Sequence, residues 1–261
     1  MFSLRKLLSD PAYESILKQH SLDSPEVTIR HREIILKKKF LKKLYTSWYQ
    51  SILKCLPSVP GKILEIGSGG GFIKEVRNDI ITSDILPLPH CEKVVSAADL
   101  PFESNELRAI ILVDTFHHLP DCGKFLSEAQ RTLNAGGKII MIEPASTLWA
   151  RFIYKNFHHE PFDGKTREWK FPSTGPLSGA NIALPWIVFF RDYAEFRKKF
   201  PLLELASVEY HTPFAYLISG GFPYKSLLPS WGFDIVKTAE LVLSPLSRLL
   251  GMFMTIVIVR K

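Results

Sequence analysis

The chain has 261 residues, of which 46% are apolar and 23% are charged, which suits one large globular domain with or without insertions. Its three cysteines, Cys55, Cys91 and Cys122, are far apart and include no CxxC pair, which argues for a reducing compartment and against a structural zinc site. Early charges argue against a secretory signal, and no stretch reaches the roughly 18 apolar residues of a membrane span, so we expect a cytoplasmic protein.

The first 58 residues are expected to form a basic helical cover. Residues 1–60 hold eleven Lys or Arg and five Asp or Glu, and so supply +6 of the net charge of +7. One long helix is predicted from about Ser24 to Leu56, because Ser24 and Pro25 are typical of a helix start. Apolar residues at every fourth position predict its buried stripe: Leu36, Phe40, Leu44, Trp48, Ile52 and Leu56.

Five lysines lie around the rest of this predicted helix: Lys37, Lys38, Lys39, Lys42 and Lys43. One interpretation is a solvated face, and another is a patch for anionic lipid head groups at the inner face of the membrane. Nucleic acid is not expected as a partner, because the chain has no recognisable nucleic-acid-binding module.

The stretch ILEIGSGGGF, residues 63–72, places four glycines directly after an apolar run. Lys62–Ile66 is predicted to be a strand, and Phe72–Val76 can open a helix. Glycine at such a turn permits positive φ and lets a ligand approach the backbone. The helix N-terminus behind it favours negative charge or lone pairs, so the stretch is typical of a nucleotide-binding loop.

From residue 61 onward, strand and helix patterns alternate. Further strands are predicted at Ile80–Asp84, Lys93–Val95, Ala109–Val113 and Lys138–Glu143, with a helix at Asp121–Leu133. This alternation indicates an α/β fold with a parallel sheet and helices on both faces. Ligands of such sheets bind at the carboxyl ends of the strands, where the glycine loop, Asp84, Asp99, Asp114 and Thr115 should meet.

The residues around the glycine loop indicate which nucleotide it binds. A dinucleotide fingerprint GxGxxG would need glycine where the chain has Phe72, and no GKS or GKT follows for a Walker-type loop. Glu65 would repel a pyrophosphate but suits a ligand with an ammonium and a sulfonium group. Asp84, 19 residues later, can accept hydrogen bonds from both ribose hydroxyls. S-adenosylmethionine meets both requirements.

Five stretches, in this order, resemble the motifs of the class I S-adenosylmethionine-dependent methyltransferases: LEIGSGGGF, TSDILPLP, AADLPF, VDTFHHLPD and NAGGKIIMIEP. Within that class they are most similar to the group that includes the ubiquinone and menaquinone C-methyltransferases, over residues 60–145. The resemblance implies a Rossmann-like, seven-stranded, mostly parallel sheet with an antiparallel edge strand. The sixth and seventh strands would then be residues 202–210 and 254–259, with a long insertion between them.

The resemblance also implies roles in binding the cofactor. The methionine moiety would be lined by Glu65, Gly67, Ser68, Gly69 and Gly71, and the ribose would be held by Asp84 beside Ile85. The adenine would be flanked by Ala97, Ala98 and Leu100, and Asp114 and Thr115 would complete the site. Relatives often carry an acid two residues before the Asp-Leu-Pro-Phe run, where this chain has Ala97. Either Asp99 replaces it from one turn away, or that contact is weaker here.

Two segments of the methyltransferase domain, residues 59–261, are expected to select the acceptor: 145–190 and 212–253. The second segment is rich in Phe, Leu, Tyr and Trp, so it either packs on the core as a cap or forms a lid or membrane-dipping element. The Trp48-Tyr49 pair, the run HHEPFD and SGANIALPW resemble a bacterial methyltransferase subgroup linked to cell-envelope glycans or lipid-linked intermediates.

Methyl transfer to a hydroxyl or enol needs positioning and a base, for which histidine is suited near neutral pH. The candidates are the pairs His117-His118 and His158-His159; no metal site is expected, because no HExxH spacing accompanies them. We expect a methyltransferase that acts on a hydroxyl or activated carbon of an apolar or lipid-linked small molecule. A glycan O-methyltransferase and a non-catalytic binding protein with this fold remain the alternatives.

Overall fold

A computed structural model of the chain describes residues 8–158, 160–172 and 175–261. It contains a seven-stranded sheet in the order β3-β2-β1-β4-β5-β7-β6. The strands are β1 (Lys62–Ile66), β2 (Ile80–Asp84), β3 (Lys93–Val94), β4 (Leu107–Val113), β5 (Leu133–Pro144), β6 (Leu203–His211) and β7 (Phe253–Arg260). The pairs among β1 to β5 are parallel, whereas β7 runs antiparallel to both β5 and β6. The predicted α/β fold with its antiparallel strand is confirmed, with β7 one place in from the edge.

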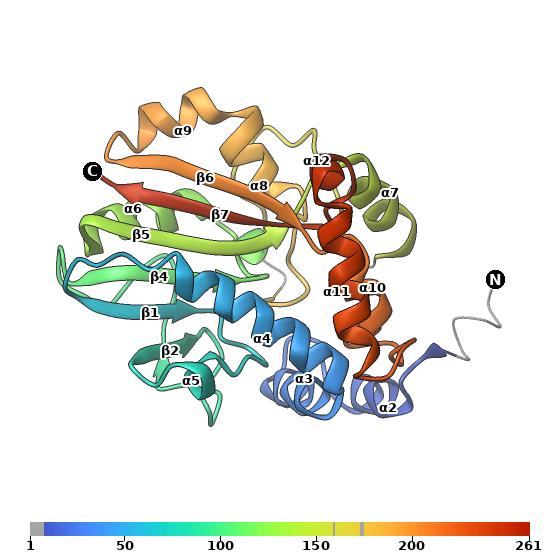
Figure 1. Ribbon diagram of the computed structural model, residues 1–261. Coiled ribbons are helices and arrows are strands. Elements are labelled where there is room, and N and C mark those ends of the chain that lie inside the picture. The colour runs from blue at the N-terminus through green and yellow to red at the C-terminus, as the bar shows by residue number, and fades with distance from the viewer. Residues whose placement is uncertain (1–7, 159, 173–174) are drawn as a thin grey trace.

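Helices and short helical turns connect the strands from β1 to β6. These are α5 (Ile73–Val76), α6 (Cys122–Thr132), α7 (Leu148–Phe157), α8 (Leu184–Trp186) and α9 (Tyr193–Lys199), with a 3-10 turn η1 (Phe116–His118) and a π-helical turn η2 (Ile187–Arg191). Asp121 caps α6, because its carboxylate accepts the Lys124 N–H at 3.1 Å. The strand predicted from Lys138 begins earlier: β5 starts at Leu133, directly after α6, because Leu133 pairs with Leu107 of β4. The carboxyl ends of the parallel strands point toward α7, α10 (Ala215–Ser219) and α11 (Gly232–Val242) (Figure 1).

The single helix predicted from Ser24 to Leu56 is wrong, because the chain breaks at Lys38 into α3 (Pro25–Lys37) and α4 (Lys39–Lys54). The Lys38 backbone has a ψ of 88°, and its ammonium donates to the carbonyl oxygens of Gly221, Phe222 and Tyr224. Asp10 adds an ion pair to the same ammonium at 3.5 Å. These long-range contacts outweigh a helical pattern that continues unbroken through Lys38.

The predicted apolar stripe is nevertheless the face that α4 packs on the sheet. Phe40, Leu44, Trp48 and Ile52 are buried, and α4 lies across the sheet in Figure 1. The start predicted at Ser24 is also confirmed, since its hydroxyl caps Val27. The cover also contains α2 (Pro11–Gln19).

The insertion between β6 and β7 folds into short helices: α10 (Ala215–Ser219), α11 (Gly232–Val242), the 3-10 turn η3 (Ser244–Leu246) and α12 (Ser247–Leu250). It packs on α4, with Phe233 edge-on to Phe40 at 5.3 Å and Tyr216 stacked on Trp48 at 6.2 Å between ring centroids. The N-terminal segment joins it, since the Asp10 N–H donates to the Pro223 carbonyl. The cover and the insertion therefore form one roof over the carboxyl ends of the strands. None of the helices in the described ranges has the length and apolar character needed to cross a membrane.

Candidate functional site

A cavity of about 1060 Å³ lies under this roof, at the carboxyl ends of β1, β2 and β4. One wall is the core, with the glycine loop, Asp84, Asp114 and Thr115. The second wall comes from the N-terminal helices, and the third comes from the insertion, including residues 220–225. A further part of the wall comes from α7 and the residues after it, including Ile153, His158 and Glu160, so the cavity is assembled from segments that are far apart in the sequence.

The four loop positions require glycine for two different structural reasons. Gly67 and Gly69 have positive φ, at 67° and 48°, and a Cβ on Gly67 would lie 2.6 Å from the Thr115 hydroxyl oxygen. Gly70 and Gly71 instead allow close packing of the N-terminal helices. A Cβ on Gly70 would lie 2.8 Å from the Arg32 nitrogen, and one on Gly71 would lie 2.6 Å from the Tyr49 hydroxyl. All four glycines line the cavity, but only the first pair has positive φ.

The helix after the loop is a single turn within the predicted Phe72–Val76. α5 has four residues and ends at Val76; the backbone of Arg77 is extended, and β2 begins at Ile80. One turn has little macrodipole, so the predicted helix N-terminus adds little to this site. The space beside the loop is filled by α3 and α4: Tyr49 accepts the Phe72 N–H at 3.1 Å, and Arg32 donates to the Gly71 carbonyl.

Two acids face the cavity beside the loop, as predicted. Glu65 is buried, accepts the Ser68 hydroxyl, and has its pKa raised to about 7 by burial, assisted by the negative charge of Asp84. The Asp84 carboxylate accepts the N–H groups of Gly69 and Leu86, both at 2.9 Å, and burial raises its pKa. Each carboxylate oxygen has further acceptor capacity. These acids fit the ammonium and the ribose diol of S-adenosylmethionine.

The other predicted cofactor residues fall into two groups. Ser68, Ile85, Ala97, Ala98, Asp114 and Thr115 line the cavity. Asp114 has a positive φ of 56°, and burial raises its pKa to about 7. Asp99 and Leu100 are not on the cavity wall: Asp99 is exposed, and the buried Leu100 donates its N–H to Glu128.

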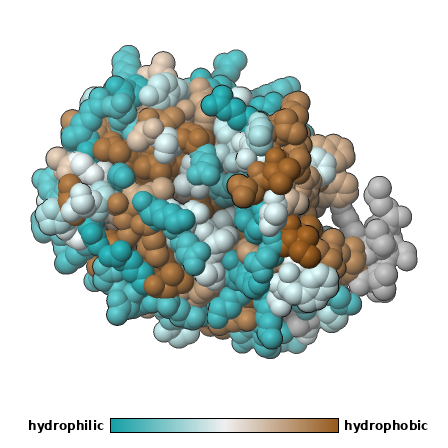
Figure 2. All heavy atoms as spheres, viewed as in Figure 1, coloured by the Kyte–Doolittle hydropathy of each residue, from teal (hydrophilic) through white to brown (hydrophobic). Residues whose placement is uncertain are grey.

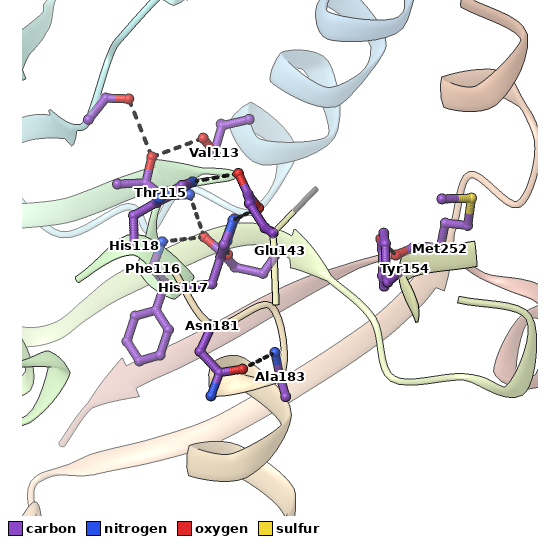
Figure 3. Close-up of polar contacts among 12 residues, drawn as sticks. Val113, Thr115, Phe116, His117, His118, Glu143, Tyr154, Asn181, Ala183 and Met252 are labelled. Atoms are coloured by element: carbon purple, nitrogen blue, oxygen red, sulfur yellow. Dashed lines mark hydrogen bonds and ion pairs between the residues drawn. The ribbon is translucent and has the colours of Figure 1, made fainter. Parts of the chain in front are cut away.

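The histidines after β4 form a cluster with Glu143 and Glu160, in which His117 and Glu143 are buried and His118 and Glu160 are half-buried. Figure 3 shows both histidines with Glu143. His117 lies off the cavity, with Nδ1 2.7 Å from a Glu143 oxygen and Nε2 3.4 Å from a Glu160 oxygen. Burial opposes protonation of His117, but the hydrogen bond and charge of Glu143 outweigh it and raise its pKa well above the ordinary value. His118 lines the cavity, and burial together with the charge of His117 lowers its pKa to about 4.

The second predicted histidine pair is only half described. His158 lines the cavity, and its Nδ1 accepts the Glu160 N–H at 3.3 Å; His159 lies outside the described residues. Burial favours the neutral form of Glu160, but His117 and His118 outweigh it and hold the pKa of this carboxyl well below its usual range.

Sequence reasoning missed Glu143 as a site residue. It ends the strand pattern as a fully buried acid, and one of its oxygens accepts the N–H groups of Thr115 and Phe116 at 2.9 and 2.6 Å. The sequence signal that could have identified Glu143 is an acid at the end of an otherwise apolar strand. A carboxylate buried there must have hydrogen-bonding or charged partners.

Comparisons with known proteins agree with this geometry. Residues 64–141 match the family model described as "Methyltransferase domain". No curated protein matches the sequence. A SAM-dependent methyltransferase from Thermotoga maritima is similar in structure, with 17% identity and a TM-score of 0.55 over 91% of this chain and 97% of that one. A geranyl diphosphate C-methyltransferase from Streptomyces coelicolor, solved with Mg²⁺, geranyl diphosphate and S-adenosyl-L-homocysteine, gives 13% identity and a TM-score of 0.47 over 88% and 84%.

At 17% identity the Thermotoga maritima structure supports the fold alone. The matched domain contains the glycine loop, Asp84, Asp114 and the histidines after β4. The sheet order and the placement of Glu65 and Asp84 at the cavity agree with that match. These findings support an S-adenosylmethionine-dependent methyltransferase: residues 64–141 match a methyltransferase domain, and the fold is the class I fold.

Proposed function

We propose that the enzyme methylates a hydroxyl or an activated carbon of an apolar or lipid-linked small molecule. The observation that supports this acceptor class is the continuation of the cofactor cavity under the roof. There the walls carry mainly apolar and aromatic side chains: Tyr13, Ile35, Tyr45, Ile153, Leu217 and Phe222. Burial of apolar acceptor surface against such walls favours binding by about 25 cal/mol per Å².

We place the reacting atom of the acceptor beside His118. This histidine and Glu160 line the cavity, whereas His117 is held off it by Glu143. The insertion contributes to the roof in two ways. Its helix α11 packs on α4, and its residues 220–225 line the cavity. The insertion would therefore be both a packed cap and the wall that contacts the acceptor.

The proposed function is tested with the purified chain and S-adenosylmethionine labelled in its methyl group. Lipid extracts and glycan fractions are supplied separately, and the label is followed after solvent partition. We expect label in the organic phase and a higher melting temperature with S-adenosylhomocysteine, but not with NAD or ATP, because ligands stabilise the state that binds them. Label confined to glycans would favour the glycan O-methyltransferase instead. Absence of stabilisation by S-adenosylhomocysteine would contradict the donor site.

Donor affinity is predicted to depend on pH through Glu65. The carboxylate form attracts the ligand ammonium, and a pKa of about 7 leaves Glu65 mostly neutral at pH 6 and mostly charged at pH 8. Affinity for S-adenosylhomocysteine should therefore rise about tenfold between these values, as linkage requires. The free energy of unfolding of the ligand-free protein should instead fall with rising pH. The raised pKa of Glu65 stabilises the folded state while this carboxyl is protonated, and that stabilisation is lost as the pH rises through about 7.

Calorimetric titration at several pH values checks this, with Glu65→Gln as the control. Asp84, Arg32, Tyr49 and Cys91 also face Glu65, but the variant removes only the Glu65 carboxyl. The tenfold slope should disappear in Glu65→Gln; a slope that persists there would assign the effect to another group.

We also propose peripheral contact with an anionic membrane. The exposed apolar residues of the insertion are Leu227, Leu228, Trp231, Ile235, Leu241, Val242, Leu246 and Leu249. Figure 2 shows apolar side chains gathered over α11 and the neighbouring α7 and α12. Lysines of α4 adjoin this surface, since Lys43 pairs with Asp234 of α11 at 3.0 Å. An apolar surface beside exposed lysines suits an anionic bilayer.

Cosedimentation with anionic liposomes should be strong at low salt and weak at high salt, where screening is short-ranged. Replacing Lys37, Lys39 and Lys43 with glutamine should weaken binding at low salt by about 1 kcal/mol per lysine. Lys38 is left intact because it holds the insertion. The control variant carries the same change of charge at three exposed lysines elsewhere on the surface: Lys170, Lys198 and Lys199. Their replacement with glutamine should leave liposome binding unchanged. If the chain ignores anionic liposomes at low salt, the lysines are only a solvated face.

A further inference from the structure

The cluster after β4 has the arrangement of a metal centre. In the part of the chain that the structure describes, His117, His118 and Glu160 each offer a ligand atom within 4.8 Å of the others. His117 Nε2 is 3.4 Å from one Glu160 oxygen, and His118 Nε2 is 3.5 Å from the other. We propose that these three side chains bind a divalent transition-metal ion with an open coordination position toward the cavity.

The separations suit ligands around an ion better than direct hydrogen bonds. Two ligands at metal bonds of about 2.1 Å in a tetrahedral site lie about 3.4 Å apart. An N–H···O hydrogen bond is usually about 2.7–3.2 Å long, so both imidazole–carboxylate separations exceed that range. Two imidazoles and a carboxylate are also a donor set that zinc and other first-row divalent ions accept.

The outer contacts of both histidines orient the Nε2 atoms inward. His117 Nδ1 bonds to Glu143 at 2.7 Å, and His118 Nδ1 lies 3.1 Å from the Gly179 carbonyl oxygen. A metal-ligating histidine typically donates its other ring N–H to such a carboxylate or carbonyl. Glu143 is in turn fixed by the N–H groups of Thr115 and Phe116. The dashed contact between His117 and Glu143 in Figure 3 shows this support for the His117 ring.

The position of the cluster gives the ion a chemical use. His118 and Glu160 line the cavity and His117 closes the site from behind, which leaves one side open to a further ligand. Three protein ligands with one open position are typical of catalytic rather than structural zinc. A hydroxyl oxygen bound there would lose its proton more readily. Metal binding does not depend on the proposed function, but the preference it implies for a hydroxyl acceptor over a carbon rests on it.

The experiment uses the full chain without a histidine tag, stripped by a chelator and titrated calorimetrically with Zn²⁺. We expect one Zn²⁺ per chain, and Co²⁺ in its place should give the visible absorption of a low-coordinate nitrogen and oxygen site. Glu143→Gln should weaken Zn²⁺ binding about 10- to 100-fold, as expected for an outer contact. His118→Ala and Glu160→Gln should each weaken Zn²⁺ binding more than Glu143→Gln does. His20 is a solvent-accessible histidine directly after α2, and His20→Ala should bind Zn²⁺ like the parent chain.

Circular dichroism verifies folding, and His118→Gln replaces any variant that fails to fold. The proposal is overturned if the parent chain binds no stoichiometric Zn²⁺, or if folded His118→Ala and Glu160→Gln retain its affinity. Stabilisation by S-adenosylhomocysteine is measured on the same samples. A chain that binds S-adenosylhomocysteine but no metal refutes the metal site alone, and the reverse result refutes the donor site alone.

Discussion

Replacing Glu143 with alanine will lower the free energy of unfolding by about 3–5 kcal/mol, the usual cost of removing one partner from a buried charge pair. The side chain is fully buried, and its two oxygens accept the N–H groups of Thr115 and Phe116 and bond to His117. Alanine would leave these buried donors without an acceptor. Guanidinium unfolding followed by circular dichroism measures the change.

Two further variants separate this effect from general weakening of the sheet. Glu143→Gln keeps an amide oxygen for the two backbone donors but loses the charge beside His117, so its loss should be smaller than that of alanine. Glu209→Ala changes an exposed acid of β6 and should stay within about 0.5 kcal/mol of the parent chain. If Glu143→Ala is no more destabilising than Glu209→Ala, the buried cluster does not hold the loop after β4.

Replacing Asp84 with alanine will weaken donor binding about ten- to hundredfold, which corresponds to the roughly 1.5–3 kcal/mol of hydrogen bonds to an ionised acceptor. Both oxygens of Asp84 already accept loop N–H groups, from Gly69 and Leu86, so the variant loses the ribose acceptor and one support of the loop together. Calorimetric titration with S-adenosylhomocysteine measures the loss.

Asp99→Ala is the matched control for this prediction. The sequence motifs place both aspartates in the cofactor site, but Asp99 is exposed and does not line the cavity. Donor affinity in Asp99→Ala should therefore equal that of the parent chain. Unchanged affinity in Asp84→Ala would remove the ribose role of Asp84, and a large loss in Asp99→Ala would show that the adenine is held from outside the cavity described above.

The strands of the core were predictable because their signals are local. β1 and β2 have the predicted bounds, and α6 differs from the predicted helix by one residue at each end. Each of these features depends on residues that are neighbours in the chain, such as an apolar run or a capping side chain. The glycine loop after β1 and the acids Glu65 and Asp84 follow from the same local pattern.

The reasons for individual residues within those motifs were less accessible. All four loop glycines suggested ligand approach, yet Gly70 and Gly71 are small because Arg32 and Tyr49 of the preceding helices pack against them. Lys38 appeared to be one lysine of a basic face, yet it breaks the helix and holds the insertion. In both cases the deciding partner is distant in sequence, and no local pattern identifies it.

The sequence alone therefore determined the sheet, the donor class and the acids beside the glycine loop. Only the tertiary structure decided that His118 reaches the cavity while His117 is held behind it by Glu143, and that Glu160 joins them from another segment. It also decided that the cover and the insertion close over the strands as one roof. The physical reason is that backbone patterns are set by neighbouring residues, whereas the environment of a side chain is set by whichever distant segments the packing of the core brings against it.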